Sequence, residues 1–243
     1  STLSPSSAAS DVYKRQCMFS WDPSEEATYI DSLIKRYLEG AYLLLDIGCG
    51  TGRVAEGLSK LGYEVTCTDI CPQMCQYSRR VRRLSSIASE GAAIPLRRES
   101  VKVAYSTLAT LNHFIGCEGL LRHLGNIHAT LIRGGAYIAD AILSPIPPTG
   151  GCESWCVTYE GRRYEALWRV ESVKDRFYLE AIELRRGRRV VFKSRALLYA
   201  PSLDEIRRLA ELVGFERVEP LKPFSLDRLS RGGRSFIIFV KGD

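Results

Sequence analysis

No apolar run in this 243-residue sequence approaches the roughly 20 positions that a membrane-spanning helix needs, so we expect no membrane helix. A secretory signal pattern is also missing, and the eight cysteines are scattered through predicted strands and helices. This combination excludes the disulfide framework of a small secreted domain and favours a reducing, cytoplasmic environment.

Histidine is scarce, with three in the chain, and none lies near the cysteines that recur at Cys67, Cys71 and Cys75. The segment that carries these cysteines passes from a predicted strand through a loop to a predicted helix. Their side chains therefore do not share one face, and we expect no zinc or other metal site.

Basic side chains outnumber acidic ones and give the chain a formal net charge of +6. Two arginine clusters contribute to it, at positions 79–83 and 185–189. Each could attract nucleic acid or an acidic partner. The favoured interpretation is a solvated helix face for the first cluster and a hairpin tip for the second.

The first sixteen residues are rich in serine and alanine and have no apolar period. We expect them to be a disordered, non-native-looking tail, with the native chain starting near Met18. Residues 17–243 are long enough for a single domain with an elaboration.

Strand and helix patterns alternate through the first part of the chain. The patterns predict strands over residues 42–47, 64–68, 101–106 and 136–143, and helices over residues 23–38, 54–61, 72–84 and 120–132. The first helix has Asp22 in the capping position. A later helix begins with a capping box at Ser202 and Glu205 and ends at Gly214, and strands follow over 215–218 and 235–241. Such alternation predicts an α/β fold with a mostly parallel sheet.

The alternation stops near Pro145, where three prolines and two glycines form a linker. Residues 152–200 then read as four strands joined by tight turns at Gly161, Lys174-Asp175 and Gly187. We expect an antiparallel β-meander inserted after the fifth strand.

The stretch LLLDIGCGTGRVAEGL places Gly48, Gly50 and Gly52 between a buried strand and a helix. A glycine-rich turn in this position brings backbone close to a ligand at the carboxyl edge of the sheet. Dinucleotide-binding proteins use G-x-G-x-x-G, whereas here the sixth position is Arg53 and the third glycine comes one residue early. A dinucleotide is therefore disfavoured as the ligand.

Asp69 ends the next strand, where a carboxylate can accept both hydroxyls of a ribose or cap the following helix.

These residues resemble a known family. DIGCGTG followed by VTCTDI is similar to motif I and the next acidic motif of class I S-adenosylmethionine-dependent methyltransferases. SEGAAIPL at residues 89–96, Arg133-Gly134-Gly135, and YAPSLDEIRRLAELVGFERV resemble three later motifs of the family, in the same order. The resemblance covers about residues 22 to 241. It implies a Rossmann-like, doubly wound, mostly parallel seven-stranded sheet whose last strand is antiparallel.

The resemblance also implies a cofactor site for S-adenosylmethionine. The turn of Gly48, Cys49, Gly50 and Gly52 would approach the methionine and ribose parts, and Asp46 would hold the methionine amino group. The remaining implied contacts are Asp69 to the ribose, Ile70 and Gly91 beside the adenine, Glu90 to the adenine amino group, and Ser106 and Thr107 at the methyl donor. Glu90 replaces a usual Asp and Arg133 replaces a usual Pro.

The methyl acceptor is less well indicated. No N-P-P-[YF] or D-P-P-Y stretch occurs, so the signature of base-amino methylation in nucleic acids is absent. The TLNHF stretch resembles small-molecule and amine methyltransferases, and it makes His113 a candidate base or substrate contact and Asn112 a candidate substrate contact. His113 could equally cap a helix or lie in a polar rim.

The β insertion is the other indication of the acceptor. In related enzymes such an insertion caps the substrate pocket and can support a homodimer, which makes Trp155 and Trp168 candidate substrate-lining residues. Tyr29 on the first helix is a candidate lid residue. The alternative for all three is ordinary packing.

The sequence thus predicts a methyltransferase that acts on nitrogen or oxygen of a small molecule. One alternative is an RNA or protein methyltransferase that uses the arginine-rich surface; nucleic acid as a partner is not favoured. Another is a non-catalytic module that binds S-adenosylmethionine and serves as a regulator.

Overall fold

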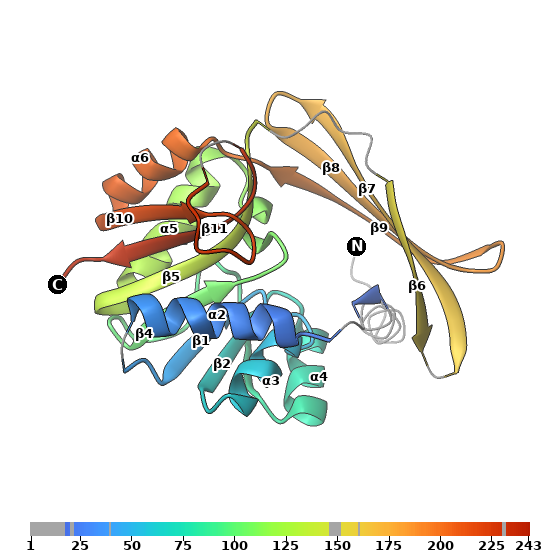
Figure 1. Cartoon of the computed structure of the whole chain (residues 1–243), viewed down its shortest axis with the longest axis horizontal. Coiled ribbons are helices and arrows are strands. Elements are labelled where there is room, and N and C mark those ends of the chain that lie inside the picture. Colours follow the sequence, from blue (N-terminus) through green and yellow to red (C-terminus); the bar gives the residue numbers. More distant parts are fainter. Residues whose placement is uncertain (1–17, 20–21, 39, 146–151, 160, 230–231) are drawn as a thin grey trace. The chain divides into compact units, whose positions relative to one another are not determined.

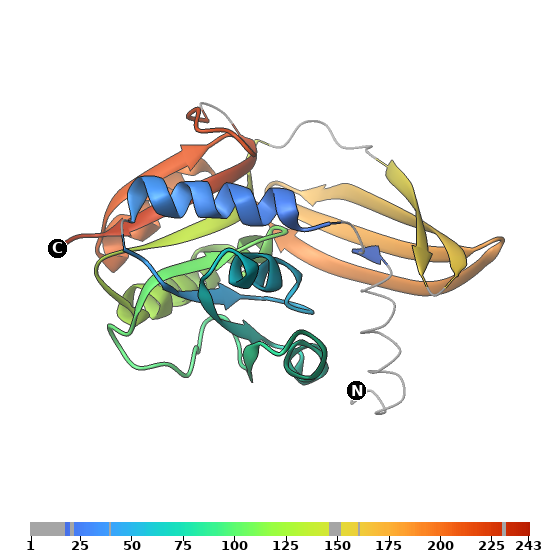
Figure 2. The same cartoon turned by 60° about the horizontal axis from the view of Figure 1, so that its bottom comes forward.

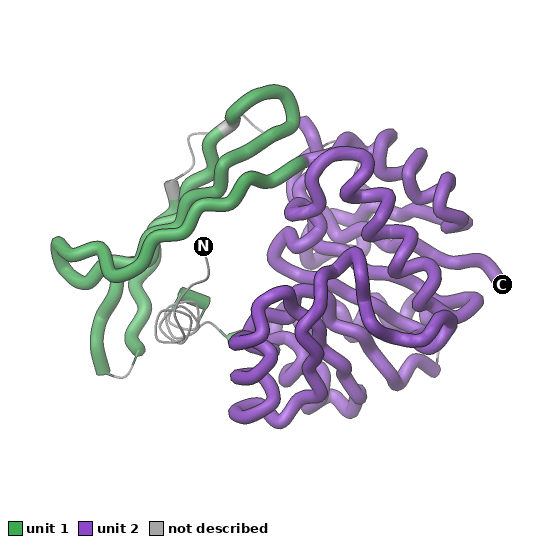
Figure 3. Tube along the Cα trace, turned by 180° about the vertical axis from the view of Figure 1, so that it is seen from behind, with its two compact units in different colours: residues 1–22, 147–199 green, residues 23–146, 200–243 purple. Residues whose placement is uncertain are grey.

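The computed structural model describes residues 18–19, 22–38, 40–145, 152–159, 161–229 and 232–243. The predicted tail over residues 1–16 lies outside them. The chain divides into two compact units (Figure 3). The larger one, here called the core unit, comprises residues 23–146 and 200–243. The smaller one, here called the meander unit, comprises residues 1–22 and 147–199 and contains the predicted insertion.

A seven-stranded sheet forms the centre of the core unit (Figure 1). Its strands are β1 (Leu43–Ile47), β2 (Glu64–Asp69), β3 (Ser85–Ala88), β4 (Val101–Ser106), β5 (Leu131–Leu143), β10 (Phe215–Leu221) and β11 (Gly233–Lys241). Their order is β10-β11-β5-β4-β1-β2-β3, and only β11 runs antiparallel to its neighbours. The predicted fold class is confirmed.

Helices cover both faces of this sheet. They are α2 (Ser24–Tyr37), α3 (Arg53–Lys60), α4 (Pro72–Arg82), α5 (Gly116–Thr130) and α6 (Leu203–Val213), with a 3-10 turn η1 (Thr110–His113) after β4. Strand side chains alternate between the faces: Ile138 packs in one core cluster with α2 and α3, whereas Tyr137 points to His123 of α5. Helices α2 and α5 accordingly lie on opposite sides of the sheet (Figure 2).

The predicted element ends are confirmed in part. Ser202 accepts a hydrogen bond from the Glu205 amide, and Gly214 ends α6 in the left-handed conformation. The predicted cap of the first helix is wrong: the capping position is Pro23, and it makes no side-chain cap. Strand β3 was not predicted, because its four residues begin with two serines and offer no apolar run.

Strand β5 is longer than predicted and begins at Leu131. The predicted strand begins at residue 136, after Gly134 and Gly135, but the observed strand runs through both glycines. A Cβ at Gly135 would lie 2.8 Å from the Lys102 carbonyl oxygen, so close packing against β4 accounts for this glycine.

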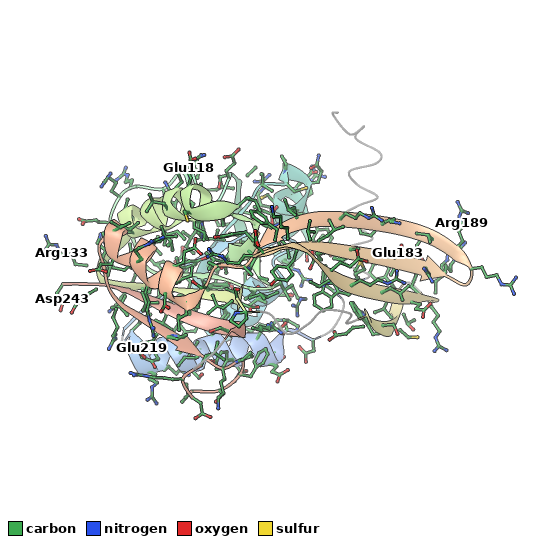
Figure 4. All side chains as sticks on the ribbon, turned by 90° about the horizontal axis from the view of Figure 1, so that it is seen from above. Glu118, Arg133, Glu183, Arg189, Glu219 and Asp243 are labelled. Carbon is green, nitrogen blue, oxygen red and sulfur yellow. The ribbon has the colours of Figure 1, made fainter. Side chains whose placement is uncertain are left out.

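The meander unit is a four-stranded antiparallel sheet of β6 (Cys152–Tyr159), β7 (Arg162–Lys174), β8 (Phe177–Arg186) and β9 (Arg189–Tyr199). The predicted meander is thus confirmed. One face carries an apolar cluster that includes Tyr164, Ala166 and Leu184, and Met18 is buried in it. Arg189 stands at the tip of the β8–β9 hairpin (Figure 4), as the sequence indicated for the second arginine cluster.

None of the helices in the described part of the chain has both the length and the apolar character needed to cross a membrane. The described residues also contain no group of three or more His, Cys, Asp and Glu side chains arranged to hold a metal ion.

Candidate functional site

The predicted cofactor residues lie at the ends of β1, β2 and β4 and in the loop after β3. Strand β1 lies between β2 and β4. The chain continues from β1 to β2 and β3 on one side and then crosses to β4 on the other side. Open α/β sheets bind ligands at such a reversal of strand order. The loop after β1 is tied to the end of β2, because the amides of Gly48 and Cys49 both donate to the Thr68 carbonyl, at 2.8 and 2.9 Å. Cys49 is half-buried and packs against the core cluster that contains Cys67.

All three glycines of the turn have positive φ, of 73°, 55° and 77° for Gly48, Gly50 and Gly52. A Cβ at Gly48 would lie 2.6 Å from the Thr110 side chain, and one at Gly52 would lie 2.6 Å from Leu84. A Cβ at Gly50 would meet no atom within 4 Å. Packing within the protein therefore requires two of the glycines, and only Gly50 borders open space.

Asp46, at the end of β1, is a buried carboxylate with a hydrogen bond to only one of its oxygens. Oδ2 accepts from the Tyr105 hydroxyl at 3.0 Å, while Oδ1 has no hydrogen-bond partner among the described residues. Burial raises the pKa of Asp46 to about 7, and the Tyr105 hydrogen bond opposes that rise. A buried carboxylate oxygen without a donor is costly, so this position suits a ligand that brings a positively charged N–H group.

Asp69 holds the glycine turn and retains acceptor capacity. Its Oδ2 accepts from the Gly50 amide and its Oδ1 from the Cys71 amide, each at 2.8 Å. Each carboxylate oxygen has a further lone pair, so both can still accept from hydroxyl groups. Ile70, the next residue, is a large apolar side chain that is 72% exposed.

The loop after β3 carries Glu90, which is exposed, and Gly91, which is packed. A Cβ at Gly91 would lie 2.6 Å from the Phe114 ring, and the Gly91 carbonyl lies 2.8 Å from His123 Nδ1. The neighbouring Ser89 has a buried hydroxyl without a hydrogen-bond partner among the described residues. Ser89 was not predicted as a site residue, although it belongs to the motif that indicated Glu90.

The end of β4 is rigidly held. Ser106 is 1% exposed, and its hydroxyl lies 2.7 Å from the Tyr137 hydroxyl. Thr107 follows, and its carbonyl accepts from both the amide and the hydroxyl of Thr110. Leu108 and Ala109 then adopt positive φ, which is unfavourable for residues with a Cβ and is a common feature of functional loops.

A buried carboxylate supports this strained loop. Asp140 is fully buried on β5; it accepts from the Leu108 amide at 2.9 Å and from two nitrogens of Arg234. Asp140 was not predicted as a site residue, because a single acidic residue inside an apolar strand has no local motif.

The residues predicted to contact the methyl acceptor differ in their exposure and hydrogen bonds. His113 is exposed on η1. Asn112 is 1% exposed, and its amide both donates to and accepts from the Ile142 backbone, each at 2.8 Å. Tyr29 is 8% exposed and donates to the Ser225 carbonyl at 2.6 Å. Asn112 and Tyr29 thus bond to the protein's own backbone.

The two tryptophans belong to the apolar face of the meander unit. Trp155 and Trp168 both pack against its buried cluster. The Trp155 indole donates to the Met18 carbonyl, and the Trp168 indole donates to the Glu180 carboxylate at 2.9 Å. Packing therefore accounts for much of their surface.

Comparisons with known proteins agree with this arrangement. Residues 45–139 match the family model described as a methyltransferase domain. A ubiquinone biosynthesis O-methyltransferase from Methylocella silvestris is 28% identical over 167 residues, which are 65% of this chain and 59% of that protein. The chain thus spans only part of the length of this curated relative.

Solved structures share the fold over nearly the whole chain. DesVI from Streptomyces venezuelae superimposes with a TM-score of 0.76 at 18% identity and 100% coverage of both chains. The sugar N-methyltransferase KedS8 from a Streptoalloteichus species gives a TM-score of 0.78 at 19% identity, covering 96% of this chain and 92% of that one. The domain match and the fold agree: residues 45–139 are similar to a methyltransferase domain, and the chain shares its α/β fold with a solved sugar N-methyltransferase.

Proposed function

We propose that this protein transfers a methyl group from S-adenosylmethionine to nitrogen or oxygen of a small-molecule acceptor. The observation that carries the proposal is the buried Oδ1 of Asp46, which has no hydrogen-bond partner among the described residues, on the strand that leads into the turn where a Cβ at Gly50 would meet no atom within 4 Å. A cofactor with an ammonium group at one end and a ribose in its middle matches that oxygen together with the Asp69 carboxylate.

The residues have separate tasks in this proposal. Asp46 holds the methionine amino group, and the backbone around Gly48, Cys49, Gly50 and Gly52 gives close approach. Asp69 accepts from the ribose hydroxyls. Ile70 and Gly91 flank the adenine, and the Glu90 carboxylate accepts from its amino group. The exposed apolar surface of Ile70 supports this role, because adenine would cover it.

The bound cofactor supplies a methyl group that its sulfonium already activates. The protein therefore contributes mainly proximity and orientation. Ser106 and Thr107, at the end of β4, border the methyl group, and Asp140 holds the loop that follows them through the Leu108 amide. His113 is exposed and serves as the base when the acceptor must lose a proton.

A small-molecule acceptor is supported by the named activities of the relatives, a ubiquinone-pathway O-methyltransferase and a sugar N-methyltransferase. Trp155 and Trp168 are proposed to contact the acceptor. The protein is also proposed to form a homodimer. Nucleic acid is not included, because two arginines of the first cluster are engaged within the chain: Arg79 donates to the Ser86 carbonyl and Arg82 to the Thr51 carbonyl.

Calorimetric titration with S-adenosylmethionine and S-adenosylhomocysteine tests the proposal. We expect micromolar binding by the wild-type protein and at least about a tenfold loss for Asp69→Ala, because the ribose hydroxyls lose their acceptor. Asp204→Ala is the matched control, since this aspartate has a 95% exposed side chain on α6. A folded wild-type protein that binds neither compound would contradict the proposal.

A further inference from the structure

A buried chain of hydrogen bonds joins the loop at Gly91 to the end of β4. His123 of α5 lies at its centre: Nδ1 is 2.8 Å from the Gly91 carbonyl, and Nε2 is 3.1 Å from the Tyr137 hydroxyl. The Tyr137 hydroxyl lies in turn 2.7 Å from Ser106 Oγ. His123 and Tyr137 are fully buried and Ser106 is 1% exposed.

The direction of every hydrogen bond in this chain follows from one fixed acceptor. A carbonyl cannot donate, so His123 Nδ1 must carry the proton that bonds to Gly91. Burial lowers the pKa of His123 to about 4, so the ring is neutral at neutral pH and Nε2 is an acceptor. Tyr137 therefore donates to His123, and Ser106 must donate to Tyr137.

Aromatic stacking adds a further segment, the loop after η1, to this junction. The Phe114 ring lies 3.7 Å from the His123 ring, with 16° between their planes. The same phenylalanine leaves no room for a side chain at Gly91. His123 thus contacts the loop after η1 and the loop after β3, and it reaches the end of β4 through Tyr137 of β5.

Two of these segments are expected to contact different parts of the cofactor. Gly91 is proposed to flank the adenine, and Ser106 to border the methyl donor. A neutral imidazole that bonds to both sides fixes the separation of the two segments before any ligand arrives, which lowers the ordering cost of binding.

We propose that His123 is a positioning residue of the methyltransferase site, which holds the adenine loop at Gly91 and the methyl-donor end at Ser106 in the spacing that the cofactor requires. This inference rests on the proposed function. His123 touches neither reacting group in it; it acts through Gly91 and through Tyr137.

Three variants separate positioning from simple packing. His123→Phe keeps an aromatic ring against Phe114 but removes both hydrogen bonds. His123→Gln keeps one donor and one acceptor in a neutral amide and so can restore both bonds. Tyr137→Phe retains the bond to Gly91 and removes only the link to Ser106. His128→Phe is the control, because His128 lies on the same helix and bonds to the carbonyl of Gly214, far along the sequence from the site residues.

The readouts are calorimetric affinity for S-adenosylhomocysteine and amide hydrogen exchange of residues 89–94 in the protein without ligand. We expect His123→Phe to weaken binding about tenfold and to speed exchange in this loop. His123→Gln should recover most of the affinity and protection. Tyr137→Phe should weaken binding with little change in exchange of the loop, and His128→Phe should change neither.

Unchanged affinity and unchanged exchange in a folded His123→Phe variant would overturn the proposal, as would a His123→Gln variant as impaired as His123→Phe. If His123→Phe does not fold, Tyr137→Phe and His123→Gln carry the test: normal binding by the first, or weak binding by the second, overturns it. A wild-type protein that binds no S-adenosylhomocysteine contradicts the proposed function, whereas the exchange measurement still tests whether His123 holds the loop.

Discussion

Asp46 and Tyr105 are paired neighbours on β1 and β4, and the Tyr105 hydroxyl donates to one oxygen of the Asp46 carboxylate at 3.0 Å. The other oxygen lacks a hydrogen-bond partner among the described residues. This arrangement stabilises the charged carboxylate only partly, because one donor does not replace the water that burial removes. A ligand that supplies the second donor would complete it.

The pH dependence of cofactor binding follows from this pair. The pKa of Asp46 is raised from 3.8 to about 7, so the carboxylate is largely protonated below that pH. A cofactor ammonium requires the charged form, so affinity should rise as pH increases from about 6 to about 8. Calorimetry across this range should show the rise in the wild-type protein. Asp46→Asn should bind weakly at every pH, and an equally steep rise in that variant would exclude Asp46 as the cause.

The same shift predicts how the stability of the ligand-free protein changes with pH. Between pH 3.8 and about 7 the folded state binds more protons at Asp46 than the unfolded state does. The contribution of this group to stability is therefore present at low pH and lost as pH rises through about 7. Urea unfolding at several pH values should show that the free energy of unfolding of Asp46→Asn rises relative to that of the wild-type protein as pH increases. Parallel curves for the two proteins would contradict this.

Glu26 of α2 and Arg53 of α3 form a buried ion pair, with 2.9 Å between Oε1 and Nη2 and both side chains 9% exposed. Removing one partner leaves a charge in the interior, so Glu26→Met should destabilise the protein by about 3 kcal/mol. Replacing both residues by Met should recover much of this loss. Lys60→Met is the control, because the Lys60 side chain is 74% exposed and its pair with Glu56 should contribute less than about 1 kcal/mol.

The sequence predicts the elements of both units well where the patterns are local. The glycine turn, the capping box at Ser202 and the tight turns of the meander are all specified by neighbouring residues, and the structure has them as expected. The residues that support the site are different. His123, Tyr137 and Asp140 come from elements far apart in the sequence, and each one alone resembles an ordinary core position.

The exposure of individual side chains also could not be predicted from the sequence. Asn112 and His113 are adjacent, yet one is buried against β5 and the other is exposed. The 3-10 turn η1 decides this, and its residues have no periodic pattern that would predict it. Likewise, only the folded packing around Thr110 and Leu84 reveals that Gly48 and Gly52 are required by the protein itself.

These neighbours allow a paired prediction for the loop after β4. Asn112→Ala removes both hydrogen bonds to the Ile142 backbone and should destabilise the protein by about 1–3 kcal/mol. His113→Ala should leave stability nearly unchanged and, for an acceptor that must lose a proton, lower kcat by about 100-fold or more. Urea unfolding and turnover of such an acceptor measure the two effects. An inactive Asn112→Ala of full stability, or a fully active His113→Ala, would reverse the roles assigned here.

The glycines of the turn give a contrast between folding and binding. Gly52→Ala would place a Cβ 2.6 Å from Leu84 and Ser78 at a φ of 77°, so it should lower stability by about 3 kcal/mol through overpacking and backbone strain together. Gly50→Ala also has a positive φ, but its Cβ would meet no atom within 4 Å. It should therefore lower stability by only about 1 kcal/mol.

Gly50→Ala should impair cofactor binding by the folded protein, although it lowers stability less than Gly52→Ala does. The Gly50 amide donates to Asp69, the proposed acceptor of the ribose hydroxyls, and the added Cβ would enter open space there, so Gly50→Ala should fold and lose affinity for S-adenosylhomocysteine at least about tenfold. Thermal unfolding and calorimetry on the same samples give both quantities. A folded Gly50→Ala that binds normally would show that the open side of the turn is not where the cofactor approaches the backbone, and Gly50 would then be needed only for its conformation.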